Sequence, residues 1–184
     1  MKKLTILMAG VALGVVAPAA VAAPPEPFGH ACSPQNGTLF CPTTSDAQRV
    51  PSFDGVPLDV DVTLPPTGDG PFPAIVMLHG WGGSKSAFQS PTPEGDGGTG
   101  YHYNNTYFAQ QGYAVITPSA RGFGRSCGVA ASRTPGSCDR GWLHLADQRY
   151  EVRDVQQVLG RLVDEGVSLG IHREDLPLWL EGLR

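Results

Sequence analysis

A short glycine-rich segment carries the clearest chemical signal in this chain. Residues 79–84 read His-Gly-Trp-Gly-Gly-Ser and directly follow an apolar run at 74–78. Glycines let the backbone turn sharply and leave N–H groups free to face a ligand oxygen. We therefore predict that the backbone N–H groups of Trp81 and Gly82 form an oxyanion hole, and that His79 orients the loop by hydrogen bonding rather than transferring protons. The alternative is a glycine-rich turn without a ligand.

A serine with the spacing of a hydrolase nucleophile stands between Gly124 and Gly128, at Ser126. A nucleophile elbow needs a strand that runs directly into the serine and a helix that starts directly after it. Here the preceding apolar run ends at Thr117, and residues 119–125 intervene before the serine. Ser126 is thus the candidate nucleophile that the spacing offers, but its context favours a structural role.

The apolar patterns predict a layered α/β fold. Residues 58–64 alternate apolar and polar side chains, which predicts a half-buried outer strand in antiparallel pairing, reached through a turn at 53–56. The apolar runs 74–78 and 113–117 predict parallel strands with helices covering both faces. These runs account for the antiparallel and parallel parts of one sheet.

Two helices are expected beside these strands. One spans 101–111 and ends at Gly112, where a missing Cβ suits a left-handed cap. In the other, 146–164, the charged residues, Asp154 among them, lie off a single apolar stripe formed by Val152, Val155, Leu159, Leu162 and Val163. The order strand, helix, strand, helix predicts right-handed crossovers and a partial doubly wound sheet, in which antiparallel outer strands lead into parallel ones.

The N-terminal residues have the pattern of an export signal. Lys2 and Lys3 precede an apolar stretch, and Ala20-Val21-Ala22 offers a small-x-small cleavage site. We expect residues 1–22 to be removed and the mature chain to be secreted or periplasmic, without a membrane anchor. Residues 23–49, rich in proline and lacking periodicity, predict an irregular arm closed by a disulfide, and residues 50–184 predict a single domain that carries the patterned elements.

Four cysteines agree with an exported chain. An even number in such a compartment favours disulfides over metal ligands or a reactive thiol. Four cysteines allow three connectivities, and we predict pairing between sequence neighbours, which closes two short loops: Cys32–Cys41 and Cys127–Cys138.

Charge and spacing exclude several ligand classes. The chain has 17 acidic against 13 basic side chains, a net charge of −4, and the basic ones form no run beyond Lys2-Lys3, so nucleic acid is not expected as a partner. The glycines at 80, 82 and 83 match neither a dinucleotide-binding nor a P-loop pattern. The carboxylates are scattered along the sequence and do not have the spacing of a metal-binding site. We therefore expect no cofactor and no metal.

Four segments resemble a known hydrolase group. They read "DGVPLDVDVTLP", "PAIVMLHGWGGS", "YAVITPSARGFGRS" and "DQRYEVRDVQQVLGRLV", and over about residues 50–165 they are most similar to the α/β-hydrolases of the X-prolyl dipeptidyl-peptidase and bacterial cocaine-esterase group. The resemblance implies a serine peptidase or esterase acting on a small ester or a peptide. It further implies a nucleophilic serine on a Gly-x-Ser-x-Gly elbow, followed along the chain by Asp and then His.

The chain departs from that pattern after about residue 165. In the group, the loop containing Ser126 precedes the true elbow, whereas residues 166–184 offer neither an apolar run of strand length nor a glycine-flanked serine. His144 and His172 follow no suitable serine and acid, so we interpret both as solvated or loop-bonded. We therefore expect the N-terminal portion of a hydrolase, truncated or frame-shifted after about 165 and inactive alone.

A function of another class stays open at this point. The same chain could be a non-catalytic extracellular binding module that uses Trp81 and the aromatic residues Tyr101–Tyr103 as a platform.

Overall fold

The computed structural model describes residues 25–170 apart from 95–96, 135 and 146, so the predicted signal segment 1–22 and His172 lie outside the described residues. The described strands and α-helices are β1 (Ser33–Gln35), β2 (Thr38–Cys41), β3 (Val50–Pro51), β4 (Pro57–Leu58), β5 (Val60–Leu64), β6 (Ala74–Val76), β7 (Ala114–Pro118), α1 (Asn105–Gln110) and α2 (Glu151–Asp164). Short helical turns connect several of them.

A mixed five-stranded sheet forms the centre of the fold, in the order β1-β2-β5-β7-β6. Strands β6 and β7 are parallel, with Ile75 opposite Val115, and the other pairs are antiparallel. This arrangement confirms the expected fold class, part of an α/β-hydrolase sheet in which antiparallel strands lead into parallel ones. The turn at 53–56 also forms, and it joins β3 to β4 in a separate two-stranded sheet.

The predicted strand 58–64 differs from its expected place in two respects. It is interrupted at Asp59, and its main part, β5, lies third among the five strands rather than at the outside. All five of its residues are buried, so the alternation does not mark a half-buried strand. The polar side chains Asp61 and Thr63 are buried because loop and helix side chains cover them and supply hydrogen bonds. Conversely, β6 is a partly exposed edge strand of the described sheet.

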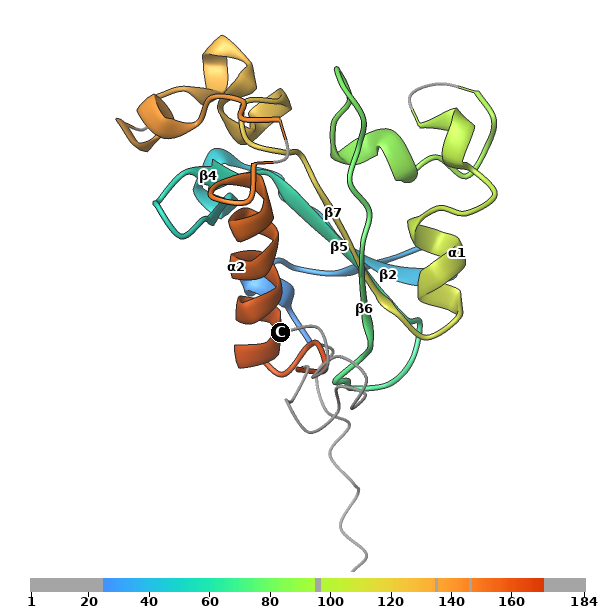
Figure 1. The fold of residues 1–184 in the computed structure, drawn as a ribbon. Helices are drawn as coiled ribbons and strands as arrows, with labels where there is room; N and C mark the ends of the chain where they lie inside the picture. Colours follow the sequence, from blue (N-terminus) through green and yellow to red (C-terminus); the bar gives the residue numbers. More distant parts are fainter. Residues whose placement is uncertain (1–24, 95–96, 135, 146, 171–184) are drawn as a thin grey trace, which may run out of the picture.

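The two helices cover opposite faces of the sheet. Asn105 of α1 donates a hydrogen bond to Thr63 Oγ1 at 2.8 Å, whereas α2 buries Val158 and Leu162 against the face that carries Val62. Successive side chains of a strand point to opposite faces, so α1 and α2 lie on the two sides of β5. Figure 1 shows them on either side of the strands.

Both helices are shorter than their sequence patterns. Helix α1 begins only at Asn105, because Asn104 caps it by accepting a hydrogen bond from the N–H of Tyr107. Helix α2 begins at Glu151, and Asp154, expected on its solvated side, is 5% exposed. The burial of Asp154 follows from an ion pair described below.

Part of the predicted irregular arm is regular within its described residues, 25–49, contrary to the expectation from its composition. It contributes the hairpin β1–β2, and β2 pairs with β5 through Phe40 and Thr63. The turn at Asn36-Gly37 has positive φ at both residues, as hairpin turns favour. A hairpin this short carries too few apolar side chains to show period-2 alternation, so the sequence pattern did not predict it.

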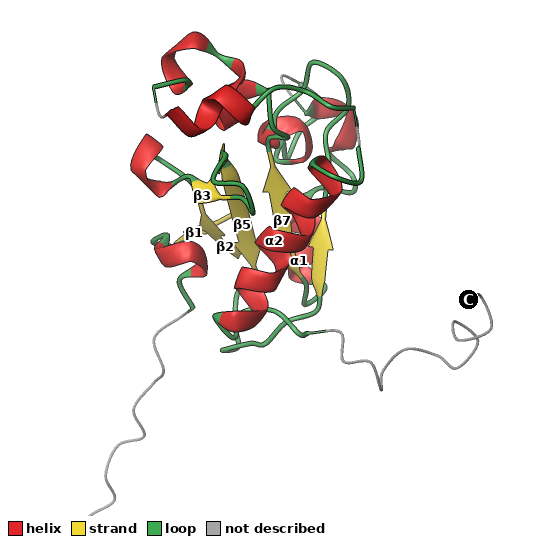
Figure 2. Cartoon of the chain, turned by 60° about the vertical axis from the view of Figure 1, so that its left-hand side comes forward, coloured by secondary structure: helices red, strands yellow, loops and turns green. Residues whose placement is uncertain are grey.

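Both predicted disulfides are confirmed, Cys32–Cys41 and Cys127–Cys138. The first links the two sides of the β1–β2 hairpin, and the second ties the turn after β7 to the segment that leads toward α2. The irregular segments that follow β6 and β7 gather at one end of the sheet (Figure 2), where the ends of parallel strands meet. In the described part of the chain, no helix is long and apolar enough to cross a membrane.

Loss of the second disulfide should destabilise this end of the molecule. For a double Cys127→Ala, Cys138→Ala variant we expect a loss of about 2.5–3 kcal/mol in the free energy of unfolding, because the unfolded chain regains the entropy of an open loop. Denaturant titration measures it, and the matched variant Cys32→Ala, Cys41→Ala, with a loop of similar length, should lose a similar amount. An unchanged unfolding midpoint would contradict the structural role.

Candidate active site

The first anchor of the glycine-rich loop is His79, directly after β6. Its Nε2 accepts a hydrogen bond from the backbone N–H of Ala120 at 3.0 Å, and its Nδ1 lies 2.7 Å from the carbonyl oxygen of Gly80. An amide N–H can only donate, so Nε2 is unprotonated and Nδ1–H donates to Gly80. With both nitrogens engaged, His79 binds the loop to the segment after β7, which is the orienting role expected of it.

The second anchor is Lys85, which follows the loop. Its Nζ lies 2.7 Å from Asp61 Oδ1 and 2.9 Å from Asp59 Oδ1, and both carboxylates are almost fully buried. Its backbone N–H donates to Ser119 Oγ at 3.0 Å. Buried carboxylates need a cation, so this ammonium fixes the end of the loop against the sheet. The sequence analysis did not predict this ion pair, for which the Asp-x-Asp spacing on a strand was the available signal.

Between these anchors the backbone is free to bind a ligand. Gly82 has a φ of +76°, and the N–H of Gly83 donates to the carbonyl of Gly80 across a turn. Within the described residues, the N–H groups of Trp81 and Gly82 donate to no protein acceptor. The Trp81 ring is 77% exposed and packs edge-on against Phe123, with ring centroids 5.7 Å apart. The structure thus presents two unpartnered amides on a loop held at both ends.

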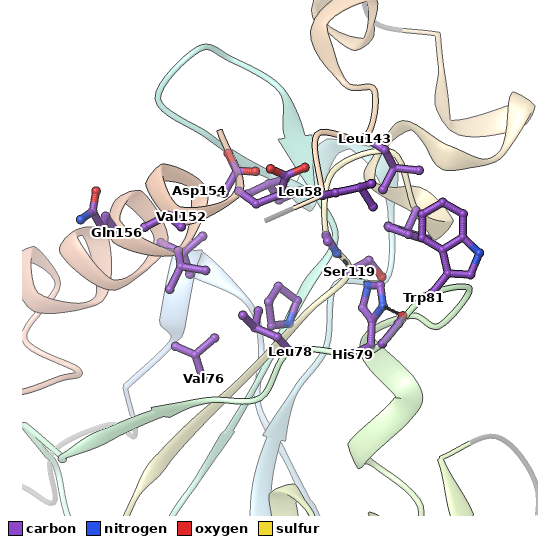
Figure 3. Close-up of a pocket in the computed structure, with 18 residues that line it drawn as sticks. Leu58, Val76, Leu78, His79, Trp81, Ser119, Leu143, Val152, Asp154 and Gln156 are labelled. Atoms are coloured by element: carbon purple, nitrogen blue, oxygen red, sulfur yellow. Dashed lines mark hydrogen bonds between the residues drawn. The ribbon is translucent and has the colours of Figure 1, made fainter. Parts of the chain in front are cut away.

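An apolar cavity of about 600 Å³ opens beside this loop. Gly80 and Trp81 of the loop line it, together with Val76 of β6 and Val155 of α2. Figure 3 shows Trp81 and His79 at one side and α2 at the other. A cavity of this volume next to free backbone donors is typical of a small-molecule site.

Ser126 lies within the fold rather than in the cavity. Its side chain is fully buried, its hydroxyl donates to the carbonyl of Ser119 at 2.7 Å, and it accepts from the N–H of Asp59 at 2.8 Å. The serine sits in a turn with φ −82° and ψ 54°, not on a strand-to-helix corner. A hydroxyl bound to two backbone groups, without a histidine beside it in the described structure, is suited to holding the β4–β5 junction against the loop after β7.

Arg121 is the central buried charge of this region, and the sequence analysis missed it. Its fully buried guanidinium binds both carboxylate oxygens of Asp154, at 2.7 and 2.5 Å, and both oxygens of Asp54, at 2.9 and 3.2 Å. Ser52 also donates to Asp154. The arginine therefore joins the β3–β4 turn, the loop after β7 and α2. Asp154 stands four residues before Val158 and eight before Leu162, so helical spacing places it on the face that these side chains bury, and this was the available signal.

These contacts shift the pKa of the groups involved. Burial of Asp54 raises its pKa, but the hydrogen bonds from the Arg121 guanidinium and the N–H of Val56 outweigh that effect and hold the pKa below the usual 3.8. Burial alone would lower the pKa of Arg121. Its hydrogen bonds to Asp154 and Asp54 have the larger, opposite effect and raise the pKa well above the usual value. Asp54 and Arg121 are therefore both ionised throughout the physiological pH range.

The aromatic residues of the proposed platform do not form one surface. Trp81 contacts Phe123, whereas Tyr103 contacts the ring of Tyr107, with no ring contact between the two groups. The His144 ring is stacked on Tyr150 and tilted against Trp142, with ring centroids 3.5 and 3.7 Å apart. Over the residues that the structure describes, no group of three or more His, Cys, Asp or Glu side chains is arranged to hold a metal ion.

Comparison with known proteins places part of this chain in a family. The family model described as X-Pro dipeptidyl-peptidase (S15 family) matches residues 54–158, the part that contains the loop, Arg121 and most of α2. A CocE/NonD family hydrolase from Staphylococcus aureus, a solved structure, matches with a TM-score of 0.43 and 19% identity, over 71% of this chain and 21% of that one. The chain thus spans about a fifth of the length of that hydrolase. The comparison with curated proteins gave no match.

Ser126→Ala should act on stability. The substitution leaves the N–H of Asp59 and the carbonyl of Ser119 buried without this partner, which costs about 1–3 kcal/mol. Denaturant unfolding measures it, and Ser45→Ala, which removes an exposed capping hydroxyl, is the control, with an expected loss below about 1 kcal/mol. Equal effects of the two substitutions would contradict the anchoring role of Ser126.

The lowered pKa of Asp54 predicts a contribution to acid stability. A carboxylate whose pKa is lower in the folded than in the unfolded state contributes fully above the usual 3.8, and the contribution is lost as the pH falls toward the folded value. The free energy of unfolding should therefore decrease more steeply between about pH 5 and pH 3 in the parent than in Asp54→Asn. Asp69→Asn, at an exposed site, should retain the parent slope. Parallel curves for all three proteins would exclude the effect.

Proposed function

The chain belongs to the X-Pro dipeptidyl-peptidase (S15) family, and on that premise we propose that it is the N-terminal part of an exported serine-type acyl hydrolase. Its substrate would be a small ester or a peptide, with X-Pro peptides as the family's own class. The described residues would supply the oxyanion-binding loop. The nucleophile and its acid and base partners would lie outside residues 25–170.

The observation that carries this proposal is the pair of unpartnered amides at Trp81 and Gly82. Attack on an ester or amide carbonyl creates a negatively charged oxygen, and preorganised N–H donors stabilise that charge in the transition state. The anchors at His79 and Lys85 keep the loop in place, so little reorganisation is needed when the charge develops. No side chain has to move a proton at this loop.

The pairing of the chain after α2 supports a nucleophile placed beside this loop. Phe72, just before β6, pairs in parallel with Ser168, through the bonds Phe72 N–H to Val167 O and Leu169 N–H to Phe72 O, both at 2.9 Å. A strand that continues this parallel pairing along β6 would end at the same end of the sheet as the loop that carries Trp81. An elbow following such a strand would present its serine next to the free amides.

Export is supported by the cysteine pairs and by the pattern of residues 1–22. Two disulfides form with no free cysteine among the described residues, which fits an oxidising compartment outside the cytoplasm. We propose removal of residues 1–22 and a secreted or periplasmic location.

The coding sequence provides the first test. Translation beyond codon 165 in all three frames should reveal Gly-x-Ser-x-Gly followed by Asp and His. A natural stop with no elbow in any frame would instead favour a non-catalytic binding module.

The second test removes one backbone N–H donor. It uses the longer hydrolase encoded by the reading frame that the first test identifies. Trp81→Pro removes the N–H and should lower kcat for p-nitrophenyl butyrate or an X-Pro p-nitroanilide by about 10²–10³, because one oxyanion donor is lost. Trp81→Ala, which retains the N–H, is the matched control and should lose far less. Equal losses would show that the ring and not the amide matters. The 184-residue chain alone should show no acyl transfer, and a burst that survives Ser126→Ala would contradict this.

A further inference from the structure

We propose that a second cavity, on the side of the sheet covered by α1, binds a small monovalent cation, potassium or ammonium. The cavity has a volume of about 100 Å³ and lies between the β1–β2 hairpin, Gln89 and the start of α1. It shares no lining residue with the larger cavity beside the glycine-rich loop. Apart from Phe40, every residue that lines it carries an amide or a hydroxyl side chain.

One amide oxygen at this cavity is buried without a partner. Asn105, which lines the cavity, is only 4% exposed. Its Nδ2 donates to Thr63 Oγ1 at 2.8 Å, whereas its Oδ1 is buried and accepts no hydrogen bond from the described residues. A buried polar atom without a partner costs free energy, so a ligand that binds Oδ1 stabilises the folded chain.

Gln89 supplies a second amide oxygen. Its Nε2 donates to Asp61 Oδ2 at 2.9 Å and to Thr117 Oγ1 at 2.7 Å. A carboxylate can only accept, so the nitrogen and not the oxygen of this amide faces Asp61. Both protons of Nε2 are thereby used, and Oε1, which accepts no hydrogen bond within the described structure, is what Gln89 can offer to a ligand.

The hydroxyl of Thr38 adds a third acceptor. It donates its proton to the carbonyl of Gln35 at 2.7 Å, so Oγ1 has only lone pairs left for a ligand. Three lining residues, Thr38, Gln89 and Asn105, therefore offer oxygens and not protons. A cation or a hydrogen-bond donor complements such a set.

The surrounding charges favour a cation over a neutral donor. Asp59 and Asp61 are buried and share one directly bound cation, the ammonium of Lys85. The nearby guanidinium of Arg125 is paired with a different carboxylate. None of the residues that line the cavity is basic. The carboxylate of Asp61 also polarises the Gln89 amide that donates to it, which makes Oε1 a stronger acceptor.

The types of ligand atom select a monovalent ion. Calcium and magnesium sites are built with carboxylates, and zinc and copper favour imidazole or thiolate, but the residues that line this cavity carry none of these groups. Neutral carbonyl oxygens are the atoms that replace the hydration shell of potassium. The expectation of no metal rested on carboxylate spacing, which a site of amide and hydroxyl oxygens does not show.

A cation in this cavity would connect three separate segments. Thr38 belongs to the β1–β2 hairpin and Asn105 to α1, whereas Gln89 follows the loop that Lys85 anchors. Gln89 binds one oxygen of Asp61, and Lys85 binds the other. Occupation of the cavity therefore stabilises the fold and supports the Lys85 anchor from the α1 side.

The test measures urea unfolding of the disulfide-bonded chain at constant ionic strength, while potassium chloride or ammonium chloride replaces tetramethylammonium chloride. Tetramethylammonium has the same charge but no N–H group, and its methyl groups keep oxygens away from the charge. A cation that binds only the folded chain raises the unfolding midpoint with a saturating dependence on its concentration. We expect this saturation. With potassium alone it assigns coordination by the oxygens, with ammonium alone hydrogen bonding to them, and each supports the site.

Variants locate the bound ion. Asn105→Asp replaces Oδ1 by a charged oxygen, and the Thr63 hydroxyl can donate to the new carboxylate, so cation binding should tighten by about tenfold. Gln111→Glu adds the same charge at an exposed position after α1, outside the cavity, and should bind as the parent does. Asn105→Leu should abolish the saturating effect. Gln89→Met, which removes the second amide oxygen, should weaken binding by about tenfold even if Asn105→Leu fails to fold.

Two results would overturn the inference. Equal midpoints in all three salts, without saturation, would mean that water alone fills the cavity. Saturating stabilisation that Asn105→Leu and Gln89→Met both retain, or that Asn105→Asp and Gln111→Glu strengthen equally, would place the cation elsewhere. The measurement involves no catalysis, so neither result bears on the proposed function.

Discussion

The buried guanidinium of Arg121 is the interaction on which the arrangement of this end of the molecule depends. It pairs with Asp54 from the β3–β4 turn and Asp154 from α2, and it donates to the carbonyl of Arg140 at 3.3 Å. Removing one partner of a buried pair leaves an uncompensated charge, which costs about 3–5 kcal/mol. Because three separate segments share this single cation, their positions are coupled, and the wall that α2 gives to the cavity is fixed relative to the loop after β7.

The same loop supports the candidate oxyanion hole. Two residues after Arg121, Phe123 packs edge-on against His79 and Trp81, with ring centroids 5.0 and 5.7 Å apart. The anchors of the glycine-rich loop thus belong to one network that reaches from α2 to β5. The loop is constrained by side chains at its ends, and within the described residues the N–H groups of Trp81 and Gly82 at its centre donate to no protein acceptor, which is the arrangement that a site for developing negative charge requires.

Much of this arrangement could be predicted from the sequence, and the failures have physical causes. The continuous apolar run at 113–117 correctly predicted β7, because a strand buried on both faces needs no alternation. The strand at 58–64 was predicted half-buried because Asp59 and Asp61 were taken as solvated, and only tertiary contact with Lys85 shows why they are not. Arg121 and Asp154 are 33 residues apart, and no local pattern could connect them.

The most direct measurement is backbone hydrogen exchange on Arg121→Met, compared with the parent protein under native conditions. If Arg121 couples the three segments, the amides of α2, of the β3–β4 turn and of the loop from Phe123 onward should all exchange faster in the variant, by similar factors. Faster exchange confined to α2, with the β3–β4 turn and the Phe123 loop exchanging as in the parent, would contradict the account.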